Sequence, residues 1–174
     1  MAHREQRAFC RKVKQFFPQY FENSRVLEIG SRNVNGSLRE LFSECEYIGV
    51  DCEKGDGVDV VCLGHNFREK PESFDVVCAA ETFEHDPFAR RTIQAMLTHL
   101  RPEGLIFTTC ASTGRKEHGT IRQGEDYGPY PEYYCNVEMN RFAQWLFATD
   151  SSFRDLHLEY REQPGDLYCY AIKN

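Results

Sequence analysis

The stretch from Arg25 to Gly36, RVLEIGSRNVNG, constrains the fold of this sequence more than any other. A short apolar run in it ends at Gly30, small and polar residues follow, and a helical pattern begins at Ser37. A buried strand that ends in a glycine turn and leads into a helix is where open α/β sheets bind nucleotide-like ligands. We therefore expect a ligand pocket at this turn.

Strand-like and helix-like segments alternate along the rest of the chain. The expected strands are 25–30, 46–50, 58–62, 74–79 and 105–110, the expected helices are 3–17, 37–44, 87–100 and 137–148, and an antiparallel hairpin joins 153–160 to 167–172. Such alternation predicts an α/β fold with a parallel sheet covered by helices on both faces, and the hairpin adds antiparallel pairing. At 174 residues the chain is expected to form one domain, 1–174.

Two segments stand outside the alternation. Residues 1–20 contain an amphipathic, basic helix, which we expect to pack on the domain with a solvated basic face. A lid or a substrate-recruiting arm is the alternative for this helix. Residues 111–136 lack periodicity, and an insert of this length is usually functional or mobile. It follows the fifth expected strand, so it is expected on the substrate side of the sheet.

Composition narrows the function classes. The net charge of −6 disfavours an extended nucleic-acid surface, although basic residues gather near the N-terminus. No apolar run has transmembrane length, and the N-terminus lacks the apolar core of a secretion signal. The eight cysteines include no C-x-x-C pair, which favours free thiols in a reducing compartment over a zinc cluster. We expect a cytoplasmic protein without a membrane partner; the sequence leaves the oligomeric state open.

Four stretches carry a family resemblance: VLEIGSRNVNGS, YIGVD, FDVVCAAETFEHDP and LRPEGLIFTT. In this order and spacing, over residues 25–110, they resemble the class I S-adenosylmethionine-dependent methyltransferases, within them the small single-domain, type 11-like group. The resemblance implies a Rossmann-like, doubly wound, seven-stranded and mostly parallel sheet with a C-terminal antiparallel hairpin. It also implies S-adenosylmethionine as cofactor and in-line methyl transfer to an acceptor, which we expect to be a small molecule.

The resemblance implies a cofactor pocket at the ends of three strands. Gly30 would let the methionine end approach bare backbone, Asp51 would accept the ribose hydroxyls, and Glu81 would face the methionine moiety. The expected cofactor-binding residues are Glu28, Gly30, Ser31, Arg32, Asn35, Gly36, Asp51, Cys52, Leu63, Gly64, Ala80 and Glu81. Relatives often carry an acid at the Leu63 position to receive the adenine amino group; here backbone carbonyls, His65 or Asn66 would replace it.

A nicotinamide cofactor fits the glycine turn poorly. Counting from Gly30, a G-x-G-x-x-G fingerprint needs glycines where Arg32 and Asn35 stand. Their side chains would obstruct a pyrophosphate, so this alternative is set aside.

Methyl transfer from a sulfonium depends mostly on alignment, and a base is needed only if the acceptor starts protonated. The expected catalytic residues are His85 and His118. His118, Arg122, Tyr133 and Tyr134 of the insert are also candidates for contacts with the substrate.

The stretch AETFEHD, from Ala80 to Asp86, has two interpretations. In one, Glu81, Glu84 and His85 join His118 in a divalent-metal site, as in a family branch that methylates RNA ends or catechol-like substrates. In the other, Glu84 and His85 cap and orient the next helix. We favour the second interpretation and expect no metal. A binding module without activity is a further alternative for the whole chain.

Overall fold

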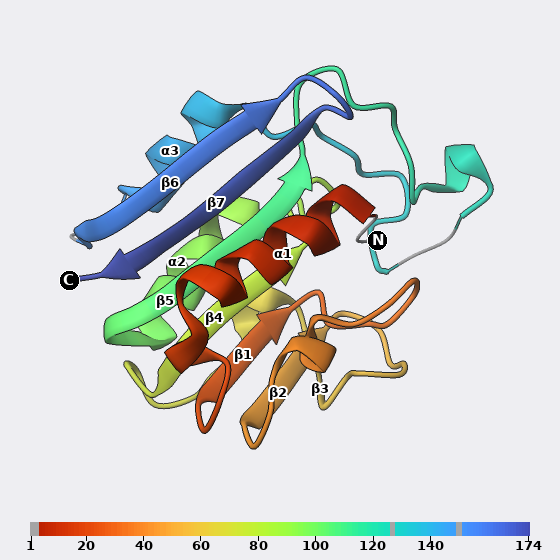
Figure 1. The fold of residues 1–174 in the computed structure, drawn as a ribbon. Helices are drawn as coiled ribbons and strands as arrows, with labels where there is room; N and C mark the ends of the chain where they lie inside the picture. Colours follow the sequence, from red (N-terminus) through yellow and green to blue (C-terminus); the bar gives the residue numbers. More distant parts are fainter. Residues whose placement is uncertain (1–3, 126–127, 149–150) are drawn as a thin grey trace.

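The computed structural model describes residues 4–125, 128–148 and 151–174 and contains a seven-stranded sheet (Figure 1). The strands are β1 (Arg25–Ile29), β2 (Glu46–Asp51), β3 (Val60–Val61), β4 (Phe74–Ala80), β5 (Leu100–Ala111), β6 (Phe153–Arg161) and β7 (Asp166–Lys173). Their spatial order is β3-β2-β1-β4-β5-β7-β6, with β1 to β5 parallel and β7 antiparallel to both β5 and β6. The expected Rossmann-like α/β fold with a closing hairpin is confirmed.

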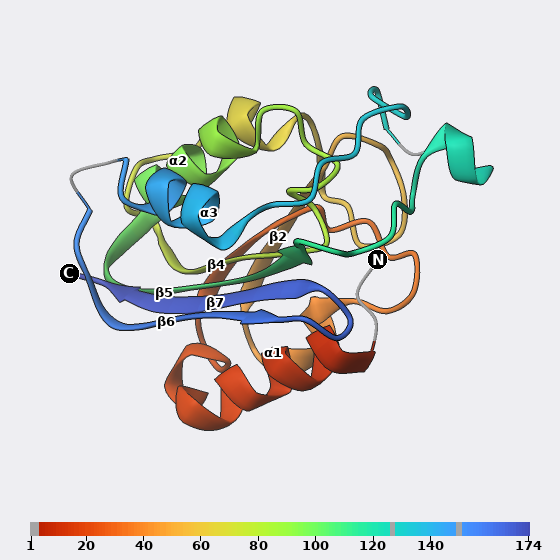
Figure 2. The same ribbon diagram turned by 90° about the horizontal axis from the view of Figure 1, so that it is seen from above.

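Helices cover both faces of the sheet. In Figure 2, α1 (Arg4–Phe16) lies against one face, and α2 (Ala89–His99) and α3 (Met139–Leu146) lie against the other. Strand side chains alternate between two apolar cores: Val26 of β1 packs in the core on the α1 side, and Leu27 in the core on the α2 side. The parallel strands are therefore buried on both faces, as their continuous apolar runs predict.

The N-terminal helix packs on the sheet. It ends at Phe16, and a 3₁₀ turn follows at Pro18–Tyr20; residues 1–3 of the expected segment lie outside the described residues. Phe9 of α1 is buried, and its ring lies 5.0 Å from that of Tyr168 in β7. The helix therefore packs on the domain, as expected, and is not a lid that stands free of it.

The helix expected at 37–44 is wrong. Only a 3₁₀ turn forms there, at Leu38–Leu41, and the chain is extended again at Phe42. The ring of Phe42 stacks on that of Phe21 at 4.6 Å, and the N–H of Ser43 donates to the carbonyl of Phe21. Packing of Phe42 against the core therefore overrides the helical propensity of this short segment.

The remaining expected elements are present with shifted ends. The strand expected at 58–62 is reduced to β3. Just before it, Asp59 bonds to Gly49 through both its backbone N–H and its carboxylate. The largest extension is at β5, which begins at Leu100.

All eight cysteines are free thiols, as the sequence predicts for the chain. Cys10, Cys78, Cys110 and Cys169 are buried in the core. Among residues 4–125, 128–148 and 151–174, no helix has both the length and the apolar character needed to cross a bilayer.

Candidate active site

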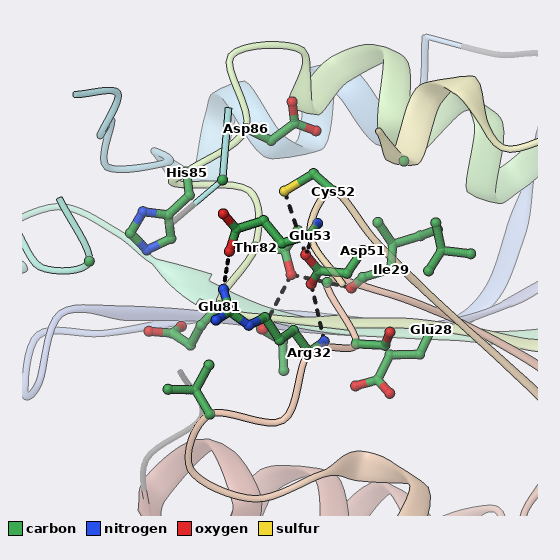
Figure 3. A pocket seen from close by; sticks show the side chains of 18 of the residues that line it. Glu28, Ile29, Arg32, Asp51, Cys52, Glu53, Glu81, Thr82, His85 and Asp86 are labelled. Atoms are coloured by element: carbon green, nitrogen blue, oxygen red, sulfur yellow. Dashed lines mark hydrogen bonds and ion pairs between the residues drawn. The ribbon is translucent and has the colours of Figure 1, made fainter. Parts of the chain in front are cut away.

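The carboxyl ends of β1, β2 and β4 open into one cleft, because parallel strands end at the same edge of the sheet (Figure 3). All the residues expected to bind the cofactor or to catalyse line it: Glu28, Gly30, Ser31, Arg32, Asn35, Gly36, Asp51, Cys52, Leu63, Gly64, Ala80, Glu81, His85 and His118. The structure thus brings the whole predicted set together, while the role of each residue stays a prediction. In Figure 3, Asp51 and Cys52 lie near the middle of the view, and Glu81 and His85 lie to their left.

Asp51, at the end of β2, ties two loops to the cleft. Its Oδ2 accepts the backbone N–H of Arg32 at 3.1 Å, and its Oδ1 accepts that of Glu53 at 3.0 Å. The Cys52 thiol also donates to Oδ1, at 3.5 Å, whereas Oδ2 keeps a lone pair for a ligand. The side chains of Arg32 and Glu53 form an ion pair beside it. Glu53 lines the cleft but was not predicted from the sequence.

The glycine turn after β1 is closed by Thr82. Gly30 has φ +77°, and a Cβ there would lie 2.0 Å from the Thr82 Oγ1 atom. The Thr82 hydroxyl donates to the carbonyl of Ile29 at 3.2 Å. The Thr82 side chain therefore leaves no room for any residue other than glycine at position 30. The exposed backbone of a glycine also suits close approach of a ligand.

Gly36, at the end of the glycine turn, lies against a side chain of the N-terminal helix. Gly36 has φ +115°, and a Cβ there would lie 2.8 Å from the Nη1 atom of Arg7 in α1. The Arg7 guanidinium also pairs with Glu40 at 3.3 Å, so α1 supports this edge of the cleft.

Glu28 is a buried acid in the wall of the cleft. Its Oε2 accepts the Tyr47 hydroxyl at 2.7 Å, and only 4% of the residue is exposed. Burial raises the pKa of Glu28 to about 7, because the charged form is poorly solvated there. Glu28 thus titrates near neutral pH.

Glu81, directly after β4, adopts an unusual backbone conformation. Its φ is +52°, a left-handed value that costs a non-glycine residue about 1 kcal/mol or more. Its side chain is fully buried, and among the described residues neither carboxylate oxygen has a hydrogen-bond partner. Burial raises the pKa of Glu81 above its usual range. Strain combined with unpaired buried oxygens makes Glu81 a candidate for a functional residue.

Two histidines and a second acid lie next to Glu81. The Nε2 atom of His118 lies 3.5 Å from Glu81 Oε2 and 3.8 Å from Glu84 Oε1. Glu84 is fully buried, and burial together with the charge of Glu81 raises its pKa. Burial, with a further contribution from His118, lowers the pKa of His85 to about 3, so His85 is neutral at pH 7.

The expected capping role of Glu84 and His85 is wrong, because the N-cap of α2 is Phe88, without a side-chain cap bond, and Asp86 is the acid that contacts the start of this helix. The Asp86 Oδ1 atom accepts the backbone N–H of Phe88 at 2.7 Å, and its Oδ2 accepts the Thr92 hydroxyl. Glu84 instead accepts the backbone N–H of Ala111 at 3.2 Å, at the end of β5. Glu84 and His85 are therefore not engaged by the helix that follows them.

A family model described as a methyltransferase domain matches residues 1–156. This chain belongs to the methyltransferase-domain family. Among curated proteins, none matches the sequence of this methyltransferase domain.

Solved structures share the fold of this methyltransferase domain. One is the 1,6-didemethyltoxoflavin-N1-methyltransferase of Burkholderia thailandensis, with 18% identity, a TM-score of 0.65, and coverage of 96% of this chain and 79% of that one. Another, from Archaeoglobus fulgidus, is an S-adenosylmethionine-dependent methyltransferase with 16% identity and a TM-score of 0.68. The match covers 97% of this chain and 94% of that one. Phosphoethanolamine N-methyltransferase 2 of Haemonchus contortus has 17% identity and a TM-score of 0.69; 96% of this chain matches 52% of that longer protein.

Some predicted contacts lie away from the cleft of the methyltransferase domain. His65 packs its ring against Phe88 at 4.8 Å, so it does not replace the acid missing at Leu63, and Asn66 does not line the cleft either. Arg122 pairs with Glu117 at 2.7 Å on the surface.

The three tyrosines of the insert that the structure describes lie in three different places. Tyr134 packs against His118 with ring centroids 5.1 Å apart, and Tyr133 borders a separate shallow depression. Tyr130 lines the cleft, although the sequence did not distinguish it from its neighbours. An aperiodic insert gives no rule for which aromatic residue turns inward, so this contact could not be read from spacing.

Proposed function

We propose that this chain is an S-adenosylmethionine-dependent methyltransferase that acts on a small acceptor by in-line methyl transfer. The observation that carries the proposal is the convergence of Gly30, Asp51 and Glu81 on one cleft from the ends of three parallel strands. These strand ends lie far apart in the sequence, and the fold alone brings them together.

The residues of the cleft fit this cofactor. Asp51 keeps a free lone pair on Oδ2 for a ribose hydroxyl, and Glu81 has two unpaired oxygens for an ammonium group or a bridging water. The buried Ser31 hydroxyl also lacks a hydrogen-bond partner among the described residues and is available to a polar ligand group. The cofactor supplies an electrophilic methyl group on a sulfonium, whose departure as a neutral thioether needs no acid.

The chain's own contribution is orientation and, for a protonated acceptor, a base. Effective alignment of the reacting atoms accounts for much of the rate in such a displacement. The His118 Nε2 atom has no hydrogen-bond partner among the described residues and lines the cleft, so it can accept a proton from an acceptor. His85, with its pKa of about 3, is a poor base at neutral pH and lines the cleft as an uncharged side chain.

A small acceptor is favoured by the insert. Gly119 and Gly128 to Tyr130 line the cleft together with His118, so the insert borders the space beside the strand ends. The net charge of −6 gives no general attraction for a polyanion.

Isothermal titration of the protein with S-adenosylmethionine, S-adenosylhomocysteine and NADH tests the cofactor. We expect the first two to bind and NADH not to bind. Asp51→Asn should weaken binding at least tenfold, since it replaces one charged acceptor, whereas Asp155→Asn on the exposed part of β6 should not. Binding of NADH alone would overturn the proposal.

Transfer of a radiolabelled methyl group to a panel of small acceptors tests the activity. Product formation that depends on Asp51 supports the transferase. Cofactor binding without transfer to any acceptor favours a binding module that keeps the fold.

A further inference from the structure

We propose that Glu84, His85 and His118, with Glu81 beside them, form a binding site for a divalent transition-metal cation. The site would lie in the cleft already described, next to the end of β4. It uses residues from three places in the sequence: Glu81 after β4, the Glu84–His85 pair and the insert.

The ligand atoms are close enough to share one ion. One atom each from Glu84, His85 and His118 lie within 4.8 Å of one another. His118 Nε2 lies 3.8 Å from Glu84 Oε1 and 3.5 Å from Glu81 Oε2. Bonds of about 2.1 Å to a common ion separate adjacent ligand atoms by roughly 3 Å and opposite ones by roughly 4 Å. Small side-chain adjustments would therefore suffice.

Unpaired buried atoms give an independent reason for a cation here. Both oxygens of Glu81, the Oε2 of Glu84 and the Nε2 of His118 are buried and lack hydrogen-bond partners among the described residues. Both carboxylate side chains are fully inaccessible to solvent. Two unsolvated acids side by side are costly unless they gain a cation or share a proton, and most buried polar atoms in proteins are satisfied.

The surroundings hold these ligands in a metal-binding form. The Nδ1 atom of His118 lies 3.1 Å from the Lys116 carbonyl, which can only accept, so Nδ1 carries the proton and the Nε2 lone pair faces the acids. Glu84 Oε1 accepts the N–H of Ala111, which fixes the carboxylate and leaves Oε2 available.

The insert also allows the two histidines to meet. A Cβ at Gly119 would lie 2.7 Å from the His85 ring, so glycine at this position lets the insert lie against that ring. The rings of His85 and His118 are then 5.2 Å apart.

The donor set selects the class of ion. Two imidazole nitrogens and two carboxylate oxygens suit borderline divalent ions such as Mn²⁺, Co²⁺ and Zn²⁺, whereas Mg²⁺ and Ca²⁺ prefer oxygen ligands alone. Any catalytic role rests on the proposed function: with an ion bound, His118 Nε2 is a ligand and not the base, and an open coordination position would hold an oxygen of the acceptor and favour its deprotonation.

Metal binding itself is the test. Metal-free protein, prepared by chelation and dialysis, is titrated separately with MnCl₂, ZnCl₂ and MgCl₂ by calorimetry. Visible absorption after addition of CoCl₂ reports nitrogen and oxygen ligation. We expect one Mn²⁺ or Zn²⁺ per chain and much weaker binding of Mg²⁺.

Matched variants locate the site. Glu84→Gln keeps the acceptor for Ala111 and should weaken Mn²⁺ and Zn²⁺ binding at least tenfold, as should His118→Ala. His157→Gln, in β6 and outside the cleft, should bind as the wild type does. Circular dichroism checks that every variant is folded.

Absence of Mn²⁺, Zn²⁺ and Co²⁺ binding to the folded wild type would overturn the metal site and favour a proton shared by the two acids. Binding that both variants retain would also overturn it. S-adenosylhomocysteine, titrated in parallel, separates the two proposals. If the protein binds the metal ion but not S-adenosylhomocysteine, only the transferase proposal fails. If it binds S-adenosylhomocysteine but no metal ion, only the metal-site proposal fails.

Discussion

Gly30 and Thr82 are in such close contact that a Cβ on Gly30 would lie 2.0 Å from the Thr82 hydroxyl oxygen. The two residues follow β1 and β4, which are neighbours in the sheet but about fifty positions apart in the chain. The contact joins the glycine turn to the loop that carries Glu81. The position of one wall of the cleft therefore depends on the other.

We expect Gly30→Ala to lower the free energy of unfolding and to weaken binding of S-adenosylhomocysteine. An alanine at positive φ costs about 1 kcal/mol, and overlap with Thr82 adds about 1–3 kcal/mol. Gly114→Ala is the matched control, because Gly114 has φ +81° with no atom within 4 Å of its Cβ position. Urea denaturation measures both, and equal losses in the two variants would contradict the steric part of this prediction.

The buried acid Glu28 should make stability depend on pH. Its folded pKa of about 7 exceeds the ordinary value of 4.5, so its stabilising contribution is complete below about pH 4.5 and is lost as pH rises through 7. Glu28→Gln is neutral at every pH and still accepts the Tyr47 hydroxyl. Relative to this variant, the wild type should lose a few kcal/mol between pH 5 and pH 8.

Denaturant unfolding at several pH values measures that difference. Glu162→Gln, at an exposed acid, controls for the change in net charge. Parallel pH profiles for the wild type and Glu28→Gln would show that Glu28 is ionised in the folded protein without cost.

Asp86→Ala should destabilise α2 by about 1–2 kcal/mol, since it removes the acceptor for the Phe88 N–H and the Thr92 hydroxyl. Thr92→Val removes one of these bonds. In a double-mutant cycle the two changes should therefore cost less together than the sum of the separate costs. Urea denaturation measures the cycle; strict additivity would mean that the Asp86–Thr92 bond contributes nothing.

The sequence predicts those parts of the site that follow from local pattern. Gly30, Asp51 and Glu81 each come directly after an apolar run, and parallel strands bring such positions to one edge. Thr82 and Glu53 were missed because their contacts depend on how neighbouring loops fold over these positions.

Two of the wrong predictions have related causes. The helix at 37–44 was replaced by a 3₁₀ turn because Phe42 packs against Phe21, a partner that local periodicity does not reveal. The capping role expected for Glu84 and His85 fails because Asp86, two positions after Glu84, is the acid that contacts the start of α2. Which of the two acids faces the helix depends on the turn between them, and a change of one or two positions reverses the answer.

The place of β7 in the sheet has a consequence for synthesis on the ribosome. This strand comes last in the sequence yet lies between β5 and β6, and its Tyr168 packs against Phe9 of the first helix. The surface on which α1 docks is therefore incomplete while the nascent chain is still being elongated. The apolar face of α1 must wait for β7 to emerge, so chaperones have a period in which to bind it.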